Sequence, residues 1–357
     1  MKSYNNLWDK FISDENIELA IKNAKRGKSK RKSVRKYLDD PDFPKKVKQY
    51  ASNYKNKRHI PKEIYDGIQR KKRTIIVPSF EEQVVHHMAV NVLKPIFSKS
   101  MYYHSYGSIP RKGAHRGKKA IEKFIRNHPK DCKYILKMDI SKYFDSIPHD
   151  ILLARLRKII RDDKFFTVIK ENISVTDKGI PLGFYTSQWI ANWYLTELDH
   201  RIKEILKAKY YIRYMDDMVI FGSNKKKLHE MRKAIADYLS GSLGLKLKDN
   251  WQVFRFDYGD KYRCLDFMGF KFFRSRTTLR RSIMLKASRK AKRMRKECGR
   301  NRLTIYTARQ MLSYLGWINC TDVYGFYVKH IKPYVNFGKL KRYVSRYDLK
   351  HKELAYE

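Results

Sequence analysis

The spacing of apolar side chains along the chain predicts a mixture of helices and strands. Apolar residues that recur every three or four positions indicate amphipathic helices, and short alternating or continuous apolar runs indicate strands. Helices are predicted within residues 1–60 and at 81–93, 120–125, 190–206, 228–239 and 286–302. A strand is predicted at 73–77, another at 134–140, and hairpins at 210–221 and 265–273. The pattern therefore indicates the α+β class.

Two of these helices have unusual patterns. Between Ile190 and Leu206 an apolar residue stands at every fourth position, which predicts one long helix with a single buried face. The segment 286–302 holds nine Lys or Arg and one acid, Glu297, and shows no apolar stripe. A helix that is basic on nearly every side is most simply explained as lying along a phosphate backbone.

The hairpin at 210–221 carries two adjacent acids at its tip, Asp216 and Asp217. Neighbouring carboxylates between buried strands repel each other unless a positive charge offsets them, and a divalent cation with oxygen ligands is the usual solution. The alternative is an Asp-Asp turn without chemistry, because Asp is common at turns. The hairpin alone does not decide between the two.

A third acid, Asp139, lies near the end of the predicted strand 134–140, and Phe144 follows five residues later. A carboxylate that emerges from a buried strand is costly unless it binds a cation or a hydrogen-bond donor. Capping the next helix would be a structural role, but Asp145 or Ser146 suits that role better. Asp139 is therefore a second candidate for cation binding.

The charge of the chain points to a polyanionic partner. The 357 residues include 80 Lys plus Arg against 36 Asp plus Glu, a net charge of +44. Long nucleic acid is the most economical partner for such an excess, because each phosphate contact also releases condensed counterions. A ribosomal or packaging protein would be equally basic, but the 26 Tyr, 18 Phe and 5 Trp in patterned segments favour a folded enzyme or binding protein.

Cysteine spacing and hydropathy bear on the compartment. The four cysteines form no C-x-x-C pair, so neither a disulfide framework nor a zinc knuckle is predicted. The first residues lack an apolar signal core, and no run approaches the ~20 apolar residues of a membrane span. We expect a soluble, cytoplasmic protein without a membrane partner.

Taken in order, the acid-bearing strand, a glycine loop leading into a helix, the Tyr-Met-Asp-Asp hairpin, an aromatic-Gly-aromatic hairpin and a basic helix resemble a reverse transcriptase. The resemblance runs from about residue 65 to about residue 300. It implies a right-hand polymerase fold, with an antiparallel palm sheet covered by helices on one face. The expected domains are a basic helical N-terminal extension (1–64), fingers (65–134), palm (135–275, with a fingers insertion near 150–180), and a helical basic thumb with a C-terminal tail (276–357).

The resemblance also assigns roles to residues. Nucleotidyl transfer uses two Mg²⁺ ions, for which Mn²⁺ can substitute, and the ions need bridging carboxylates from different strands. Asp139 and Asp216 match the bridging ligands, Asp217 a supporting one, and Ile140 is included with the metal residues. The residues expected to bind the nucleotide are Lys72, Arg73, Arg111, Lys112, Phe144, Leu182 and Gln188. Those expected to bind primer or template are Phe267, Met268, Gly269, Phe270, Arg289 and Arg293.

Within these implied roles, Phe144 would exclude a 2′-hydroxyl, Arg73 would clamp the triphosphate and Gln188 would contact the templating pair. The turn 267–270 resembles a primer grip. The expected substrates are deoxynucleoside triphosphates, a template RNA and the growing RNA/cDNA heteroduplex.

The glycine loop discriminates among reverse transcriptases. It reads Pro-Leu-Gly-Phe-Tyr-Thr-Ser-Gln over 181–188, and its Ser-Gln ending is similar to diversity-generating retroelements, whereas intron and retron enzymes generally end in Ser-Pro. This resemblance implies copying of a template-repeat RNA with errors at adenines (mutagenic retrohoming) and a small helical-bundle accessory protein that forms a pentamer. It also implies that Arg73 and Leu182 affect misincorporation.

Two alternatives stay open. The first is a retron-like or antiphage-defence reverse transcriptase that makes a dedicated cDNA. The second is an RNA-binding or splicing-helper protein whose palm is only a scaffold, because a fold never fixes function. The three aspartates argue against the scaffold, since clustered acids without a cation would only destabilise it.

Overall fold

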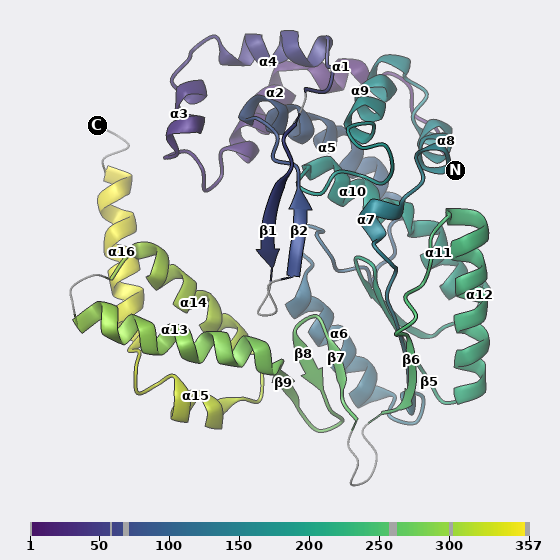
Figure 1. The fold of residues 1–357 in the computed structure, drawn as a ribbon, viewed down its shortest axis with the longest axis vertical. Helices are drawn as coiled ribbons and strands as arrows, with labels where there is room; N and C mark the ends of the chain where they lie inside the picture. Colours follow the sequence, from purple (N-terminus) through teal and green to yellow (C-terminus); the bar gives the residue numbers. More distant parts are fainter. Residues whose placement is uncertain (1, 58, 67–70, 257–262, 300–302, 354–357) are drawn as a thin grey trace. The chain divides into compact units, whose positions relative to one another are not determined.

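The computed structural model describes residues 2–353 except 58, 67–70, 257–262 and 300–302. Helices and strands are both present in quantity, as the predicted α+β class requires (Figure 1). The chain forms two compact units, each made of two segments. Unit 1 comprises residues 1–113 and 134–253, and unit 2 comprises residues 114–133 and 254–357. These units divide the chain at other places than the predicted fingers, palm and thumb, and that functional division remains a prediction.

Unit 1 begins with four helices that pack around a fifth. The four are α1 (Trp8–Ile12), α2 (Asp14–Ala24), α3 (Lys32–Leu38) and α4 (Phe43–Ser52), so the helical character predicted for residues 1–60 is confirmed. The fifth helix, α5 (Phe80–Ser100), starts at a capping box in which Ser79 and Glu82 satisfy each other's backbone N–H groups. It extends past the predicted end at residue 93 and contains Pro95. Helices α1, α2, α3 and α4 all contact α5.

Two sheets belong to the part of the chain that also holds the acids. The strands β1 (Lys62–Asp66) and β2 (Lys71–Ile75) form an antiparallel pair. The larger sheet has the order β4-β5-β3-β6, with antiparallel pairing of β3 with β5 and of β4 with β5. Its strands are β3 (Tyr134–Met138), β4 (Tyr210–Tyr214), β5 (Asp217–Gly222) and β6 (Gln252–Arg255). The chain passes from unit 1 to unit 2 within β6.

The remaining helices of unit 1 come after β3 in the chain. Of these, α12 packs on β3 and β5. They are α7 (Tyr143–Ser146), α8 (His149–Ile159), α9 (Asp163–Ile173), α10 (Tyr185–Tyr194), α11 (Thr196–His200), the π-helix η1 (Arg201–Ile205) and α12 (Lys225–Leu243).

The prediction of a single long helix at 190–206 is wrong. The segment is divided at Leu195 and ends in a π-helical turn, although Leu198 and Ile202 are still buried. Periodicity shows which face is buried but does not detect a local change of hydrogen-bonding pattern.

Unit 2 combines a small sheet with helices. The sheet has the order β7-β8-β9, formed by β7 (Leu265–Phe267), β8 (Phe270–Phe272) and β9 (Thr277–Leu279). The helices are α6 (Ala114–Asn127), α13 (Arg281–Gly299), α14 (Ile305–Asn319), α15 (Tyr324–His330) and α16 (Phe337–Glu353). Helix α6 begins six residues earlier than predicted.

The prediction that the basic helix has no apolar stripe is wrong. Ala287, Ala291 and Met294 of α13 are buried, at spacings of four and three residues. Two of the three buried side chains are alanines, so the apolar stripe is narrow. It is difficult to recognise in the sequence because the residues on either side are mostly basic. Residues 300–302, the end of the predicted helix, lie outside the described part of the chain.

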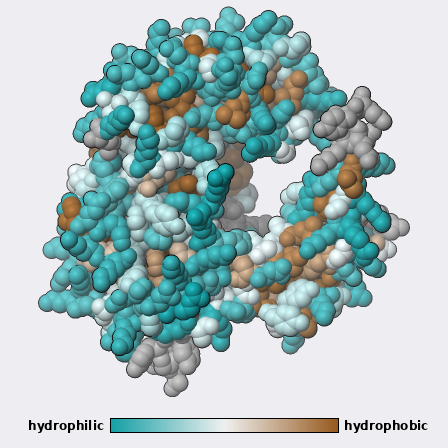
Figure 2. Space-filling view, turned by 180° about the vertical axis from the view of Figure 1, so that it is seen from behind, coloured by the Kyte–Doolittle hydropathy of each residue, from teal (hydrophilic) through white to brown (hydrophobic). Residues whose placement is uncertain are grey.

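The surface of the molecule is predominantly hydrophilic in the view of Figure 2, as the excess of Lys and Arg leads one to expect. Among the described residues, none of the helices has the length and apolar character needed to cross a membrane.

A fully buried ion pair holds β4 to α11. Arg213 donates to Asp199 through Nε (2.8 Å to Oδ1) and Nη2 (2.5 Å to Oδ2), and neither side chain is exposed. Tyr211 also donates to Asp199, over 2.7 Å. Burial alone would lower the pKa of Arg213, but the charge and hydrogen bonds of Asp199 outweigh burial and raise the pKa. The pair is therefore charged in the folded protein.

The same arginine also contacts the turn that carries the two acids. Its Nη1 donates to the carbonyl of Met215 (3.0 Å), and its Nη2 lies 3.2 Å from the carbonyl of Asn192. Asn192 in turn donates to the carbonyl of Gly107 (2.8 Å). A Cβ on Gly107 would lie 2.5 Å from Cγ of Met215, so this close approach needs glycine.

Helix α5 also supports the glycine loop through a buried histidine. The ring of His86 lies 4.3 Å from the ring of Phe184, and His86 is completely buried. Burial lowers the pKa of His86 to about 3, with smaller contributions from His87 and His59. No function is predicted for this residue from the sequence, and its surroundings are those of a neutral core side chain.

We expect Asp199→Ala to destabilise the protein by about 3–5 kcal/mol, because the change leaves the buried Arg213 charge without a partner. Urea unfolding measures this loss. Asp39→Ala is the matched control, since Asp39 pairs with Arg35 on the surface, where both side chains are more than half exposed, and it should change stability little. A loss for Asp199→Ala no larger than the control would contradict the assigned role.

Because the pKa of the buried His86 is low, we expect the free energy of unfolding to decrease in mild acid. The folded protein keeps this histidine neutral down to pH about 3, whereas the unfolded chain binds a proton below pH about 6.5. The contribution is complete above that pH and is lost as the pH falls, by about 2 kcal/mol at pH 5.

Urea unfolding at pH 7 and pH 5 tests this expectation. Wild type should lose about 2 kcal/mol more than His86→Leu on acidification. Equal losses in the two proteins would show that His86 does not cause the pH dependence.

Candidate active site

The two adjacent acids lie where β4 turns into β5. Tyr214 of β4 is paired with Asp217 of β5, so Met215 and Asp216 form the connection. Met215 has φ +55°, a left-handed conformation that is uncommon for a side chain of this size. The hydrogen bond from Arg213 to its carbonyl stabilises this turn. The predicted acid-tipped hairpin is therefore present in the structure.

The neighbouring strand brings a third acid to the turn. Met138 of β3 is paired with Met218 of β5, which places Asp139 directly after the strand beside the turn. The side chains of Asp139 and Asp216 are hydrogen bonded to each other. Burial, followed by the charge and hydrogen bond of Asp139, raises the pKa of Asp216 to about 7. Two carboxyl groups from different strands thus share one small site.

These two carboxyl groups fit a divalent cation. Mg²⁺ is commonly bound by one or two carboxylates, with water and substrate phosphates as the other ligands. Two carboxyl groups in mutual contact, one of them difficult to ionise, gain from such an ion because it offsets their repulsion. Within the described residues, no group of three His, Cys, Asp or Glu side chains is arranged to hold a metal ion.

The other predicted metal residues are placed as follows. Asp217 opens β5 and is half-buried, and it adds a smaller repulsion to Asp216. Ile140 has a fully buried side chain, so only its main-chain carbonyl is available to an ion. A site with all these ligands remains a prediction.

The glycine loop is attached to two segments that carry predicted nucleotide-binding residues. The N–H of Ile180 donates to the carbonyl of Phe144 (2.8 Å), and a Cβ on Gly179 would lie 2.4 Å from that oxygen. Phe144 is half-buried and packs against the core. At the other end, the N–H of Ile76 donates to the carbonyl of Leu182 (2.7 Å).

Gly183 explains why a glycine is needed in this loop. Its φ is +113°, and a Cβ would lie 2.0 Å from the carbonyl oxygen of Ile76. Any side chain would push the loop away from the end of β2. The segment 179–183, which leads into and begins the glycine loop, is therefore a fixed connection between Phe144 and the β1–β2 pair.

The predicted basic nucleotide-binding residues lie on the surface. Lys72 and Arg73 are exposed on β2, and Lys72 pairs with Glu63 (2.6 Å). Arg111 is exposed with φ +61°, and Lys112 donates to the carbonyl of Tyr103 (2.6 Å). Their contact with a nucleotide remains a prediction.

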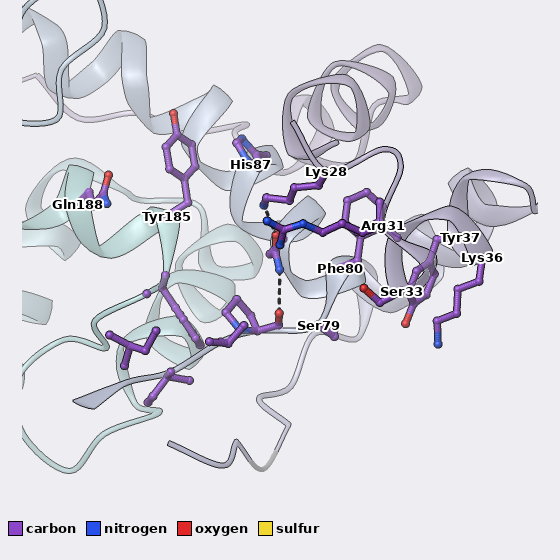
Figure 3. A pocket seen from close by; sticks show the side chains of 18 residues that line it. Lys28, Arg31, Ser33, Lys36, Tyr37, Ser79, Phe80, His87, Tyr185 and Gln188 are labelled. Carbon is purple, nitrogen blue, oxygen red and sulfur yellow. Dashed lines mark hydrogen bonds between the residues drawn. The ribbon is translucent and has the colours of Figure 1, made fainter. Parts of the chain in front are cut away.

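A cavity of about 580 Å³ lies between the N-terminal helices, the end of β2 and the glycine loop (Figure 3). Lys28, Arg31 and Lys36 line it, as does the predicted template contact Gln188, which is exposed. Lys28 donates to Gln83 (2.5 Å), and burial followed by the charge of Arg31 lowers the pKa of Lys28. These three basic residues belong to a run of nine Lys or Arg between Lys22 and Lys36, which reaches the glycine loop through contacts with α5 that the sequence does not show.

In unit 2 the predicted primer grip is the β7–β8 turn. Met268 and Gly269 have φ values of +51° and +88° and connect the strands. The rings of Phe267 and Phe270 are buried, and Phe270 lies 5.0 Å from the ring of Trp317. Gly269 is buried as well, so Met268 is the partly exposed residue of this turn that a nucleic acid could contact.

The predicted phosphate contacts of unit 2 are on helix α13. Arg289 and Arg293 are both exposed, and Arg293 pairs with Glu297 (3.0 Å). They lie on the solvent side of the buried stripe formed by Ala287, Ala291 and Met294. Their position is compatible with phosphate binding, which remains a prediction.

Two further residues that bear on the site, Lys248 and Arg213, are not among those predicted from the sequence. Lys248 pairs with Asp139, and Arg213 supports the acid turn. Arg213 carried a signal, because a charged residue inside an apolar strand requires a partner. Lys248 carried none, since it is one of many lysines.

Comparison with known proteins agrees with this geometry. The family model described as "Reverse transcriptase (RNA-dependent DNA polymerase)" matches residues 57–272, which include all three aspartates and the glycine loop. Protein YkfC of Escherichia coli is 23% identical over 224 residues, which cover 50% of this chain and 58% of that protein. The Retron Ec73 reverse transcriptase of Escherichia coli is 27% identical over 189 residues, covering 49% of this chain and 57% of the relative.

A solved structure of apo telomerase from Candida tropicalis aligns with a TM-score of 0.46 and 13% identity, over 62% of this chain and 55% of that one. The chain spans less than two thirds of the length of each of these three proteins. The family match, which covers more than half of the chain, is the decisive comparison. The chain therefore belongs to the reverse transcriptase (RNA-dependent DNA polymerase) family, and its α+β architecture is the right-hand polymerase fold of that family.

Proposed function

We propose that this chain is an RNA-directed DNA polymerase that extends a primer 3′-hydroxyl on an RNA template. The observation that carries the proposal is the contact between Asp139 and Asp216, which come from adjacent strands and meet at one partly buried turn. Shared carboxylates of this kind are what nucleotidyl transfer requires, because they bind cations at the reacting oxygens. Family membership supports the same reaction class.

In this proposal each part of the site has a distinct task. Bound Mg²⁺ ions, or Mn²⁺ in their place, would activate the 3′-hydroxyl and offset the charge of the triphosphate. Asp139 and Asp216 hold the ions, with Asp217 and the carbonyl of Ile140 in support. Phe144, fixed by the glycine loop, limits the space at the 2′ position of the incoming sugar.

The basic residues supply the remaining contacts. Lys72, Arg73, Arg111 and Lys112 offer positive charge to the triphosphate, since Arg in particular can bind two phosphate oxygens at once. Arg289 and Arg293 of α13 offer charge to the backbone of the primer–template duplex. The turn at Met268 and Gly269 would position the primer.

We further propose that the enzyme is of the diversity-generating retroelement type and copies a template-repeat RNA with errors at adenines. The Ser187-Gln188 ending of the glycine loop supports this. The resemblance connects Arg73 and Leu182 with misincorporation. Their segments are joined by a backbone hydrogen bond, because the N–H of Ile76, three residues after Arg73, donates to the carbonyl of Leu182. The expected partner is a pentameric helical-bundle accessory protein.

A retron-like enzyme that makes a dedicated cDNA is the second candidate. It is favoured by the 27% identity to the Retron Ec73 reverse transcriptase. The two candidates share the polymerase reaction and differ in the product, so the sequence of the cDNA separates them.

We expect Asp216→Asn to lower the rate of primer extension on an RNA template with Mg²⁺ by on the order of 10³-fold, because the change removes a charge at the reacting atoms. Incorporation of labelled deoxynucleotides measures this rate. Asp237→Asn is the matched control, since Asp237 is exposed on α12 and the chemical change is the same. Undiminished synthesis by Asp216→Asn would refute the proposed polymerase site.

Sequencing of the cDNA tests the subtype. If the retroelement proposal is correct, substitutions concentrate at template adenines, and replacing Arg73 or Leu182 changes their frequency more than it changes the frequency at other bases. Errors spread evenly over the four template bases would favour the retron-like candidate and exclude the mutagenic one.

A further inference from the structure

The segment that follows helix α12 runs alongside the chain that carries Asp139. The N–H of Lys248 donates to the carbonyl of Asp139 (2.8 Å), and the N–H of Ser141 donates to the carbonyl of Lys246 (2.8 Å). Between them Ile140 and Leu247 form an antiparallel bridge. Backbone hydrogen bonds on both sides therefore fix which residue of this segment lies beside Asp139.

This register places a lysine on the acid site. Leu247 points into the core, Lys246 is exposed, and Nζ of Lys248 bonds to Oδ2 of Asp139. The side chains of Lys248 and Asp139 are only 34% and 22% exposed. An ion pair on the open surface is weak and variable in geometry, whereas this one is partly shielded and held in place by the backbone.

The contact has a consequence for cation binding. A lysine ammonium group is a compact charge with three donors and no acceptor, so it occupies a carboxylate oxygen in the way a metal ion does. It also repels a second cation at the same oxygen. A metal ion that uses Oδ2 of Asp139 must therefore displace Lys248.

We propose that Lys248 is a positioning residue that takes the place of a divalent cation at Asp139 and thereby weakens metal binding to the free enzyme. This inference rests on the proposed function, because it assumes that Asp139 is a metal ligand. In the absence of metal, the ammonium group offsets part of the negative charge that Asp139, Asp216 and Asp217 concentrate at the turn. When an ion binds at Asp139, the Lys248 side chain would leave Oδ2 by a change of rotamer, which its flexible aliphatic chain allows.

The test is a titration of the full-length protein with Mn²⁺ alone, followed by electron paramagnetic resonance, without nucleotide or nucleic acid. Lys248→Met should bind Mn²⁺ roughly fivefold more tightly than wild type, because one nearby positive charge is removed. Lys246→Met is the matched control, as it removes an equal charge from an exposed position two residues away, and should bind as wild type does. Lys248→Arg keeps the charge and should restore the wild-type affinity.

The outcomes separate this inference from the proposed function. Asp139→Asn should weaken Mn²⁺ binding strongly, and if it does while Lys248→Met binds no more tightly than Lys246→Met, the role of Lys248 is refuted and the metal site stands. If Asp139→Asn binds Mn²⁺ as wild type does, the proposed metal site is refuted, and the inference fails with it. Thermal unfolding of each variant verifies that the changes in affinity do not come from unfolding.

Discussion

The buried pair of Arg213 and Asp199 is the interaction on which the geometry of the acid turn depends. A charged pair without solvent contact is costly to form, and it persists because each hydrogen-bonding group of the arginine finds a partner. One end of Arg213 binds helix α11, and the other binds the carbonyl of Met215 in its left-handed conformation. Strand, helix and turn are thus fixed by one side chain, and this turn contains Asp216 and leads directly into Asp217.

Once the turn is fixed, electrostatic repulsion governs the site. Asp139 and Asp216 are brought together by the pairing of β3 with β5, which costs free energy because both carboxyl groups are partly buried. The high pKa of Asp216, near 7, reflects this cost. The pairing of Lys248 with Asp139 offsets part of it, and a divalent cation would offset more.

Three glycines allow close backbone contacts around the site that a side chain would prevent. Gly107, Gly179 and Gly183 each allow a backbone approach that a Cβ would prevent. The last two attach the glycine loop to Phe144 and to the end of β2, so a residue expected to contact the sugar and a strand expected to contact the triphosphate are connected through one short segment. The basic residues expected to bind phosphates in each unit, among them Lys72, Arg73, Arg289 and Arg293, are exposed.

The sequence by itself determined the α+β class, the acid-tipped hairpin, the Gly269 turn and the family. Each depends on local periodicity or on a short motif whose residues are adjacent in the chain. Tertiary structure alone decided that Asp139 touches Asp216, that Lys248 rather than Lys246 faces Asp139, and that the helix predicted for 190–206 divides at Leu195. These features depend on strand register and on contacts between residues up to 109 positions apart. A pattern of apolar residues fixes which face of an element is buried, but the partner that covers this face is chosen by packing over the whole chain.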